Sequence, residues 1–227
     1  MARAELHSGS ATIGTTAVSV VSGTTTLSSS AVDGVYSFFF DTAAIAGQDL
    51  FRFQVKEKVR SAGTQRTVYQ TTSGVGIQSV VYPSLLLMHG WDATVTKVTG
   101  TDRSIAWSAR QVTGATISEP FSGSALIGVT EFSLPNASTT LTPRTEGGIY
   151  QLWIDTTPLA PGDLYRLRIY EKVIPAGAQR RIEDFHLSPQ GEVFVSPTLD
   201  LYHGWDMTLD KLAGTDRTLE WSIRRMV

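Results

Sequence analysis

Hydrophobic and polar residues alternate along several short segments of the chain. In residues 50–58, LFRFQVKEK, the apolar side chains Phe51, Phe53 and Val55 alternate with polar ones. A period of two is typical of a β-strand that buries one face. We therefore expect a half-buried strand here and another in residues 164–172. The apolar positions of that second segment are Tyr165, Leu167 and Ile169.

The same alternation occurs elsewhere in the chain and predicts the fold class. Ile105, Trp107 and Ala109 share one face of a segment, as do Leu219, Trp221 and Ile223 of a later one. Further strands are predicted over residues 11–20, 24–28, 35–40, 65–72, 84–88 and 94–98. Each of these segments has a counterpart in the second half of the chain, which gives about eight short strands per half. Such strands, separated by Gly, Ser or Asp turns, favour an antiparallel sandwich or barrel. The predicted class is all-β, with at most one helical turn over residues 42–46 after Asp41.

The chain contains two copies of one sequence pattern. HGWD occurs at residues 89–92 and again 114 positions later at 203–206. GTDR, SGSA and a Trp-Ser pair recur at the same spacing without a gap. A repeat of this length predicts two domains of one fold. We expect two tandem antiparallel β-sandwich or jelly-roll-like domains, at residues 1–112 and 113–227, joined by a short linker.

The motif HGWD places a histidine close to an aspartate, so we weighed a metal site against a turn. Each copy offers one imidazole and one carboxylate, whereas a catalytic zinc site takes about three protein ligands. The motif lies between two apolar strands. Its glycine allows unusual backbone angles, and its aspartate can accept bonds from amides two residues on. We interpret it as a structural turn whose tryptophans cover one end of the sandwich. The residues are His89, Gly90, Trp91, Asp92, His203, Gly204, Trp205 and Asp206.

The remaining polar motifs do not form a catalytic constellation. GTDR is predicted to be a solvated hairpin turn between the last two strands of each copy, carrying Asp102 or Asp216. The pair Glu57-Lys58 is predicted to be a solvated strand end. The sequence has no nucleophile elbow, P-loop or dinucleotide fingerprint. We expect no enzyme activity, no cofactor and no metal.

Composition and charge narrow the partners and the compartment. The net charge is −2, and basic residues are scattered among acidic ones, so nucleic acid is not an expected partner. The chain has no cysteine, which excludes disulfides and thiolate zinc sites. No apolar run reaches the roughly 20 residues of a membrane span, and the first residues lack a signal-peptide core. We expect a soluble protein made in a cytosol, without a membrane partner.

One aromatic position in each copy departs from the alternation. In VYSFFFD, Phe39 falls on the face that should be wet, and its counterpart in the second copy is Trp153. Aromatic side chains on an outer sheet face often mark a contact surface. Burial of Phe39 and Trp153 at an interface between the two copies explains their positions about as well as a contact surface does. Phe39 and Trp153 are therefore the candidate interface residues.

Four segments are distinctive as strings: HSGSATIG, EFSLPNASTTLTP, GIYQLWIDTTPLAPGDLYRLRIYEKV and HGWDMTLDKLAGTDRTLEWSIRR. With them, nearly the whole chain resembles small virion structural proteins of tailed bacteriophages. The resemblance implies a capsid decoration or cement protein, made in the host cytoplasm and located in the virion. Its implied partners are the major capsid protein or other virion proteins. We expect a homo-oligomer, with a trimer favoured because closed symmetry can cover exposed aromatic residues.

Two other roles are compatible with the same sequence. A tail-tube or head–tail junction component is one, since a tandem duplicate in a trimeric ring imitates six-fold symmetry. A carbohydrate-binding sandwich that uses exposed Trp or Tyr as a sugar platform is the other. Decoration proteins should bind preassembled capsids, tube proteins should form rings, and sugar binders should be retained by a glycan.

Overall fold

A computed structural model describes residues 2–227, and over this range the regular elements are strands without any helix. The predicted all-β class is thereby confirmed. The chain divides into two compact units, of which the first ends at Ile117 and the second spans Ser118–Val227. The seam predicted after residue 112 lies slightly before this division. The described residues include no helix with the length and apolar character needed to cross a membrane.

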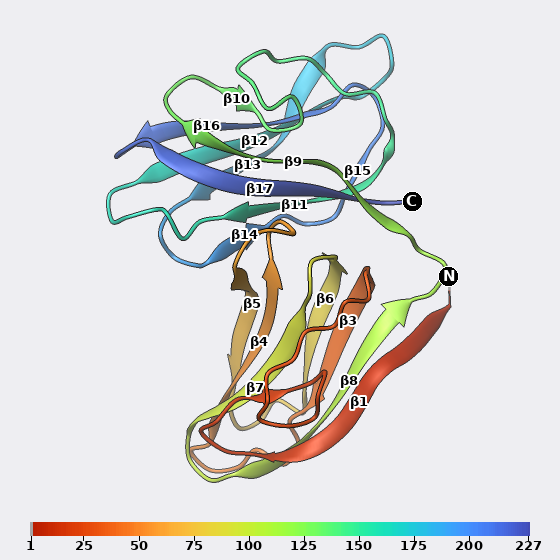
Figure 1. The fold of residues 1–227 in the computed structure, drawn as a ribbon, viewed down its shortest axis with the longest axis vertical. Helices are drawn as coiled ribbons and strands as arrows, with labels where there is room; N and C mark the ends of the chain where they lie inside the picture. Colours follow the sequence, from red (N-terminus) through yellow and green to blue (C-terminus); the bar gives the residue numbers. More distant parts are fainter. Residues whose placement is uncertain (1) are drawn as a thin grey trace. The chain divides into compact units, whose positions relative to one another are not determined.

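The first unit is a sandwich of two antiparallel sheets with four strands each (Figure 1). One sheet has the order β1-β8-β3-β6, and the other has the order β2-β7-β4-β5. Of these eight strands, only β4 and β5 are both consecutive and paired, so the other connections cross between the sheets. This is the jelly-roll topology. The strands are β1 (Arg3–Ile13), β2 (Val18–Ser19), β3 (Gly34–Asp41), β4 (Leu50–Lys58), β5 (Gln65–Ser73), β6 (Ser79–Leu87), β7 (Asp92–Thr99) and β8 (Arg103–Val112).

The second unit repeats this topology with one strand divided in two. Its sheets have the orders β9-β17-β11-β14, with β15 also paired to β11, and β10-β16-β12-β13. β14 and β15 stand where the first unit has β6, and Ser196 and Pro197 lie in the gap between them. The strands are β9 (Ile117–Ile127), β10 (Phe132–Ser133), β11 (Gly148–Asp155), β12 (Leu164–Lys172), β13 (Gln179–Leu187), β14 (Val193–Val195), β15 (Leu199–Leu201), β16 (Asp206–Ala213) and β17 (Arg217–Met226).

The alternation in the sequence correctly identifies the core side chains. Phe51, Phe53 and Val55 of β4 are fully buried. Trp107 of β8 and Trp221 of β17 are buried at equivalent positions of the two units. The two jelly rolls thus have equivalent cores at these positions. The matching residues of β12 are also fully buried: Tyr165, Leu167 and Ile169.

Some predicted elements differ from the observed ones. Residues 24–28 are bends and irregular backbone, because local side chains bond the chain there: the Ser22 hydroxyl donates to the Thr26 carbonyl at 2.7 Å. The strand predicted over 11–20 is the end of β1 followed by the short β2. The turn after Asp41 is not helical, and Ala43 N donates to the Asp41 carboxylate at 3.0 Å.

The prediction of a hairpin turn at GTDR is wrong, because β7 and β8 belong to different sheets. The segment crosses between the sheets and is held by Asp49, which accepts bonds from Thr101 N at 2.8 Å and from Arg103 Nε at 2.6 Å. The bond from Thr101 N is the main reason why the pKa of Asp49 falls to about 2. Asp102 is exposed, as predicted, and pairs with Lys97. The second unit repeats the first two bonds through Asp163, Thr215 and Arg217.

Candidate functional site

The HGWD motif of each unit crosses from one sheet to the other. In the first unit it follows β6, and its backbone is held by β4 and β5. His89 N donates to the Glu57 carboxylate at 2.7 Å, and Gln65 Nε2 donates to the Gly90 carbonyl at 3.2 Å. Glu57 is fully buried, so its prediction as a solvated strand end is wrong: the carboxylate serves the backbone of the motif. The second unit repeats these bonds through His203, Glu171, Gln179 and Gly204.

The tryptophans of the two motifs are fully buried. The Trp91 indole donates to the Val32 carbonyl at 3.0 Å, and its ring lies 4.6 Å from the ring of Tyr36. Trp205 donates to the Glu146 carbonyl at 2.9 Å, and its ring also lies 4.6 Å from a tyrosine ring, that of Tyr150. These contacts support the structural interpretation of HGWD, which is tested by variants described in the Discussion.

The motif aspartates do not form the predicted hydrogen bonds to backbone amides two residues further along the chain. The Asp92 carboxylate accepts the Ser19 hydroxyl at 2.9 Å, and Asp206 accepts the Ser133 hydroxyl at 2.8 Å and Met207 N at 2.8 Å. The serines lie 73 residues away and are brought close by the pairing of β2 with β7 and of β10 with β16. Local spacing cannot show such partners, which explains the error.

Burial raises the pKa of the Asp206 carboxyl to about 6, above the ordinary value near 3.9. Because the folded state holds this proton more tightly, the contribution of Asp206 to stability is greatest below about pH 4 and falls as the pH rises through 6. We expect the melting temperature of the natural protein relative to Asp206→Asn to drop between pH 4.5 and pH 7.5. Asp200→Asn, which removes an exposed carboxyl, should show no such trend. Parallel curves for all three proteins would contradict the assignment.

Metal-binding side chains do not gather within residues 2–227. No group of three or more His, Asp or Glu residues there has an arrangement that could hold a metal ion. The Glu57 and Glu171 carboxylates accept bonds from the backbone amides of the HGWD histidines, at 2.7 Å from His89 N and 3.1 Å from His203 N. The geometry therefore directs attention to surfaces and recesses rather than to a metal centre.

The candidate interface residues occupy equivalent positions on β3 and β11. Phe39 is half-buried and Trp153 is fully buried. The Arg110 guanidinium lies 4.0 Å from the centroid of the Phe39 ring, and Arg224 lies 3.9 Å from that of Trp153. Each unit thus carries an arginine stacked on an outward aromatic ring, at positions related by the sequence repeat. Such pairs contribute about 0.5–1 kcal/mol at exposed sites and about 2 kcal/mol when desolvated.

The arginines of these pairs are fixed by hydroxyl groups. Arg110 Nε donates to the Ser108 hydroxyl at 3.0 Å, and Arg224 Nε donates to the Ser222 hydroxyl at 3.3 Å. The two copies differ in accessibility, because Arg110 is exposed whereas Arg224 is fully buried. We call the first-unit pair of Phe39 and Arg110 the open aromatic–arginine pair.

The surface around the open aromatic–arginine pair is partly apolar. Val81 of β6 stands opposite Phe39 in the strand register and is 53% exposed. A recess of about 280 Å³ lies beside the pair, and its lining includes Ala106 and Ser108 of β8. The outer face of the β1-β8-β3-β6 sheet thus combines an aromatic ring, an aliphatic side chain and an exposed cation.

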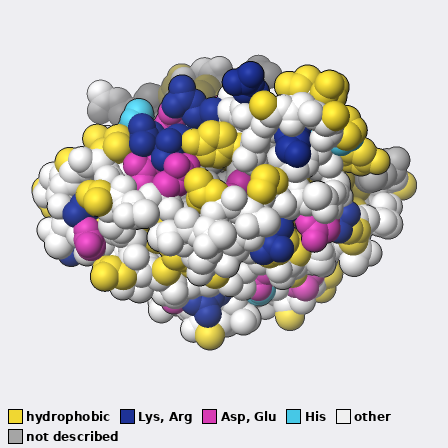
Figure 2. Space-filling model, turned by 90° about the horizontal axis from the view of Figure 1, so that it is seen from above, with side chains coloured by type: hydrophobic (Ala, Val, Ile, Leu, Met, Phe, Trp, Pro, Cys, Tyr) yellow, Lys and Arg dark blue, Asp and Glu magenta, His cyan; other side chains and the backbone are white. Residues whose placement is uncertain are grey.

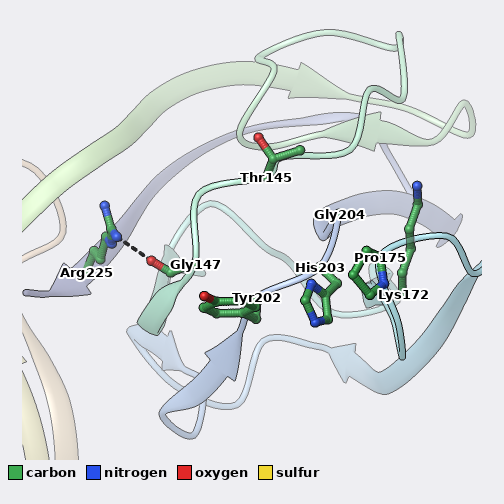
Figure 3. A pocket seen from close by; sticks show the side chains of 8 residues that line it. All are labelled: Thr145, Gly147, Lys172, Pro175, Tyr202, His203, Gly204 and Arg225. Carbon is green, nitrogen blue, oxygen red and sulfur yellow. Dashed lines mark hydrogen bonds between the residues drawn. The ribbon is translucent and has the colours of Figure 1, made fainter.

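A larger recess, of about 590 Å³, lies beside the HGWD motif of the second unit. Figure 3 shows Tyr202 and His203 between two cationic side chains, Arg225 on one side and Lys172 on the other. Arg225 comes from β17 and donates to the Gly147 carbonyl. This recess is absent from the sequence predictions, which weigh His203 as a metal ligand and as part of a turn.

Charges on the surface are mixed in sign. Figure 2 shows basic and acidic side chains close together on the face drawn, rather than a stripe of one sign. On the second unit, Arg168 bridges Glu131 at 2.9 Å and Asp210 at 3.0 Å, and Arg166 also pairs with Asp210. Proteins that bind nucleic acid usually carry a stripe of basic side chains. That nucleic acid is not a partner of this protein stays our prediction.

The geometry defines a tandem jelly-roll protein with two surface features, and comparisons with known proteins add structural similarities. No protein-family model and no curated protein matches the chain. It is similar to the PBSX exported protein XepA, with a TM-score of 0.34 and 7% identity over 100% of this chain and 86% of that one. A CBM22 tandem domain from Paenibacillus barcinonensis has a TM-score of 0.25 and 8% identity, over 92% of this chain and 82% of that one. A triple jelly-roll protein from the turret of an archaeal virus has a TM-score of 0.28 and 8% identity, over 99% of this chain and 59% of that one. All three TM-scores are below 0.5, so function is argued from the residues of this chain.

Proposed function

We propose that the protein is a structural component of a bacteriophage virion, namely a decoration or cement protein that binds the major capsid protein. The observation that carries the proposal is the open aromatic–arginine pair on the outer sheet face of the first unit. Arg110 is stacked on Phe39 at 4.0 Å and remains exposed, and Val81 beside it is exposed as well. A protein whose role is to attach to a lattice needs an accessible surface of this kind rather than a catalytic cleft.

The chemistry of the pair indicates what it contacts. Aromatic and arginine side chains are enriched among the residues that dominate binding energy at protein interfaces. A partner that supplies an apolar side chain for Phe39 and Val81, and a carboxylate for Arg110, complements this face. We propose that a homotrimer presents three such faces, because multivalent attachment multiplies individually weak contacts.

Substitution of Phe39 tests the capsid proposal. We expect Phe39→Ser to weaken binding to capsids that lack the protein by about tenfold or more, since loss of a central anchor typically costs more than 1 kcal/mol. Co-sedimentation with the capsids measures the affinity. Val129→Ser is the matched control, because Val129 is an exposed aliphatic residue outside this face and should leave binding unchanged.

Other outcomes separate the alternatives. If the natural protein does not bind capsids that lack it and instead polymerises into rings or tubes, it is a tail-tube or head–tail junction component. Light scattering on the free protein measures the oligomeric state, and a monomer would contradict the trimer. Equal binding by Phe39→Ser and Val129→Ser would overturn the assignment of the open aromatic–arginine pair to the capsid.

A further inference from the structure

The recess beside HGWD in the second unit has the charge of an anion-binding site. Its lining includes Lys172, His203 and Arg225 and no carboxylate side chain. Within residues 2–227, neither Lys172 nor Arg225 forms an ion pair. Two acidic residues stand next to the lining in the sequence. Glu146 precedes Gly147 and is exposed, whereas the carboxylate of Glu171, which precedes Lys172, accepts bonds from Tyr202 N and from His203 N at 3.1 Å.

The floor of the recess is an aromatic platform. Tyr202 is 65% exposed, and its ring stands edge-on to that of His203 with a centroid distance of 4.8 Å. Gly147 makes room for the platform, because a Cβ at this position would lie 2.5 Å from Cδ2 of Tyr202. An exposed tyrosine ring held in a recess of 590 Å³ offers a flat apolar surface large enough to stack a sugar ring.

The backbone frame of the recess recurs in the first unit without its chemistry. Gln111 Nε2 donates to the Asp33 carbonyl at 3.0 Å, as Arg225 donates to the Gly147 carbonyl in the second unit. His89 and Lys58 match His203 and Lys172 in the sequence repeat, but five other lining positions differ. The second-unit residues and their first-unit counterparts are Thr145 and Ala31, Gly147 and Asp33, Pro175 and Ser61, Tyr202 and Met88, and Arg225 and Gln111.

Three of these differences act in the same direction. Arginine in place of glutamine adds a cation, glycine in place of aspartate removes an anion, and tyrosine in place of methionine adds the platform. The shared frame explains why both units fold alike, whereas the differences assign ligand chemistry to the second unit alone. An arginine that is already oriented by a backbone carbonyl binds a carboxylate with little loss of side-chain freedom.

We propose that this recess binds an acidic sugar, with the sugar ring stacked on Tyr202 and its carboxylate bound by Arg225 at one side, while Lys172 at the other side adds to the positive charge. The ligand class is a glycan that contains uronic or similar acid-bearing sugars. The inference is independent of the capsid proposal, because the open aromatic–arginine pair lies on the first unit and the recess on the second. A virion protein with both would attach to its particle by one unit and to a surface glycan by the other.

Calorimetric titration of the full chain tests the site. We expect binding of a glucuronic acid oligosaccharide and at least tenfold weaker binding of a glucose oligosaccharide of the same length. Tyr202→Met and Arg225→Gln should each weaken the binding of the acidic oligosaccharide at least tenfold. Both substitutions install the residue that the first unit already carries on the same frame. Lys172→Gln should weaken binding about threefold or more, since an exposed ion pair contributes up to about 1 kcal/mol, whereas Lys58→Gln should have no effect.

Three results would overturn the proposal. One is no binding of the acidic oligosaccharide at millimolar concentration. Another is binding of inorganic phosphate as tight as that of the oligosaccharide and unaffected by Tyr202→Met, which would indicate a simple anion site. The third is equal binding of the glucose oligosaccharide. Melting curves of each variant identify any loss of fold. If Tyr202→Met and Arg225→Gln unfold, the binding measured for Lys172→Gln, a change at the end of β12, tests the proposal instead. Capsid binding by Arg225→Gln should remain intact, so failure of one proposal is distinguishable from failure of the other.

Discussion

Replacing Trp205 with alanine is expected to lower the free energy of unfolding of the second unit by about 3–5 kcal/mol. The indole is fully buried, packs on Tyr150 and donates to the Glu146 carbonyl. Alanine would leave a cavity among the core side chains, and the Glu146 carbonyl would lose one of its two donors and keep the Tyr150 hydroxyl. Urea denaturation followed by circular dichroism measures the change.

The matched control for this variant is His203→Ala. The motif histidine is held through its backbone amide, which alanine retains, so we expect a change within about 0.5 kcal/mol. A loss below 1 kcal/mol for Trp205→Ala would contradict the structural interpretation of HGWD. So would a stoichiometrically bound metal ion that disappears in His203→Ala.

Gly214→Ala is expected to destabilise the second unit by about 2–4 kcal/mol. Gly214 has a φ of +87°, a left-handed conformation that costs an L-residue about 1–2 kcal/mol. A Cβ there would also lie 2.2 Å from the Asp163 carboxylate and 2.7 Å from Asp163 Cα, so the bonds that hold the GTDR segment would have to shift. Thermal denaturation measures the loss.

A second glycine separates the two causes of this effect. Gly162 has a φ of +94° but would place its Cβ in open space, so Gly162→Ala should show the backbone cost of roughly 1 kcal/mol alone. Equal losses in the two variants would mean that the close approach of the added Cβ to Asp163 costs no stability.

The sequence predicts what depends on neighbours along the chain. Alternation at Phe51, Phe53 and Val55 identifies a strand and its buried face, because both follow from the local period of two. It does not identify the sheet to which a strand belongs, and for this reason the prediction of a hairpin at GTDR is wrong. That information resides in pairings such as Arg3 with Val112, which join residues at opposite ends of a unit.

The difference between local patterns and pairings of distant residues also explains which parts of the candidate site the sequence could predict. The position of Phe39 on an outer face follows from alternation, but its partner Arg110 requires the register that sets Phe39 beside Ser108 of β8. For the recess, the informative signal was in the sequence, in the positions where the two copies differ. The two copies share HGWD, whereas Tyr202 and Arg225 of the second copy stand where the first copy has Met88 and Gln111.

The pairing of β1 with β8 governs how the chain can fold during synthesis. Because the first strand of each unit closes against the last one, neither sandwich can complete until nearly all of its residues have left the ribosome. The strands β1 and β9 both carry SGSA, so we expect each to be able to pair with the edge of β8 or of β17. Their order of emergence favours the correct pairing, since β1 is present when β8 appears and β9 is not. Refolding from denaturant removes that order, and exchange of β1 for β9 is then the expected route to misfolded chains.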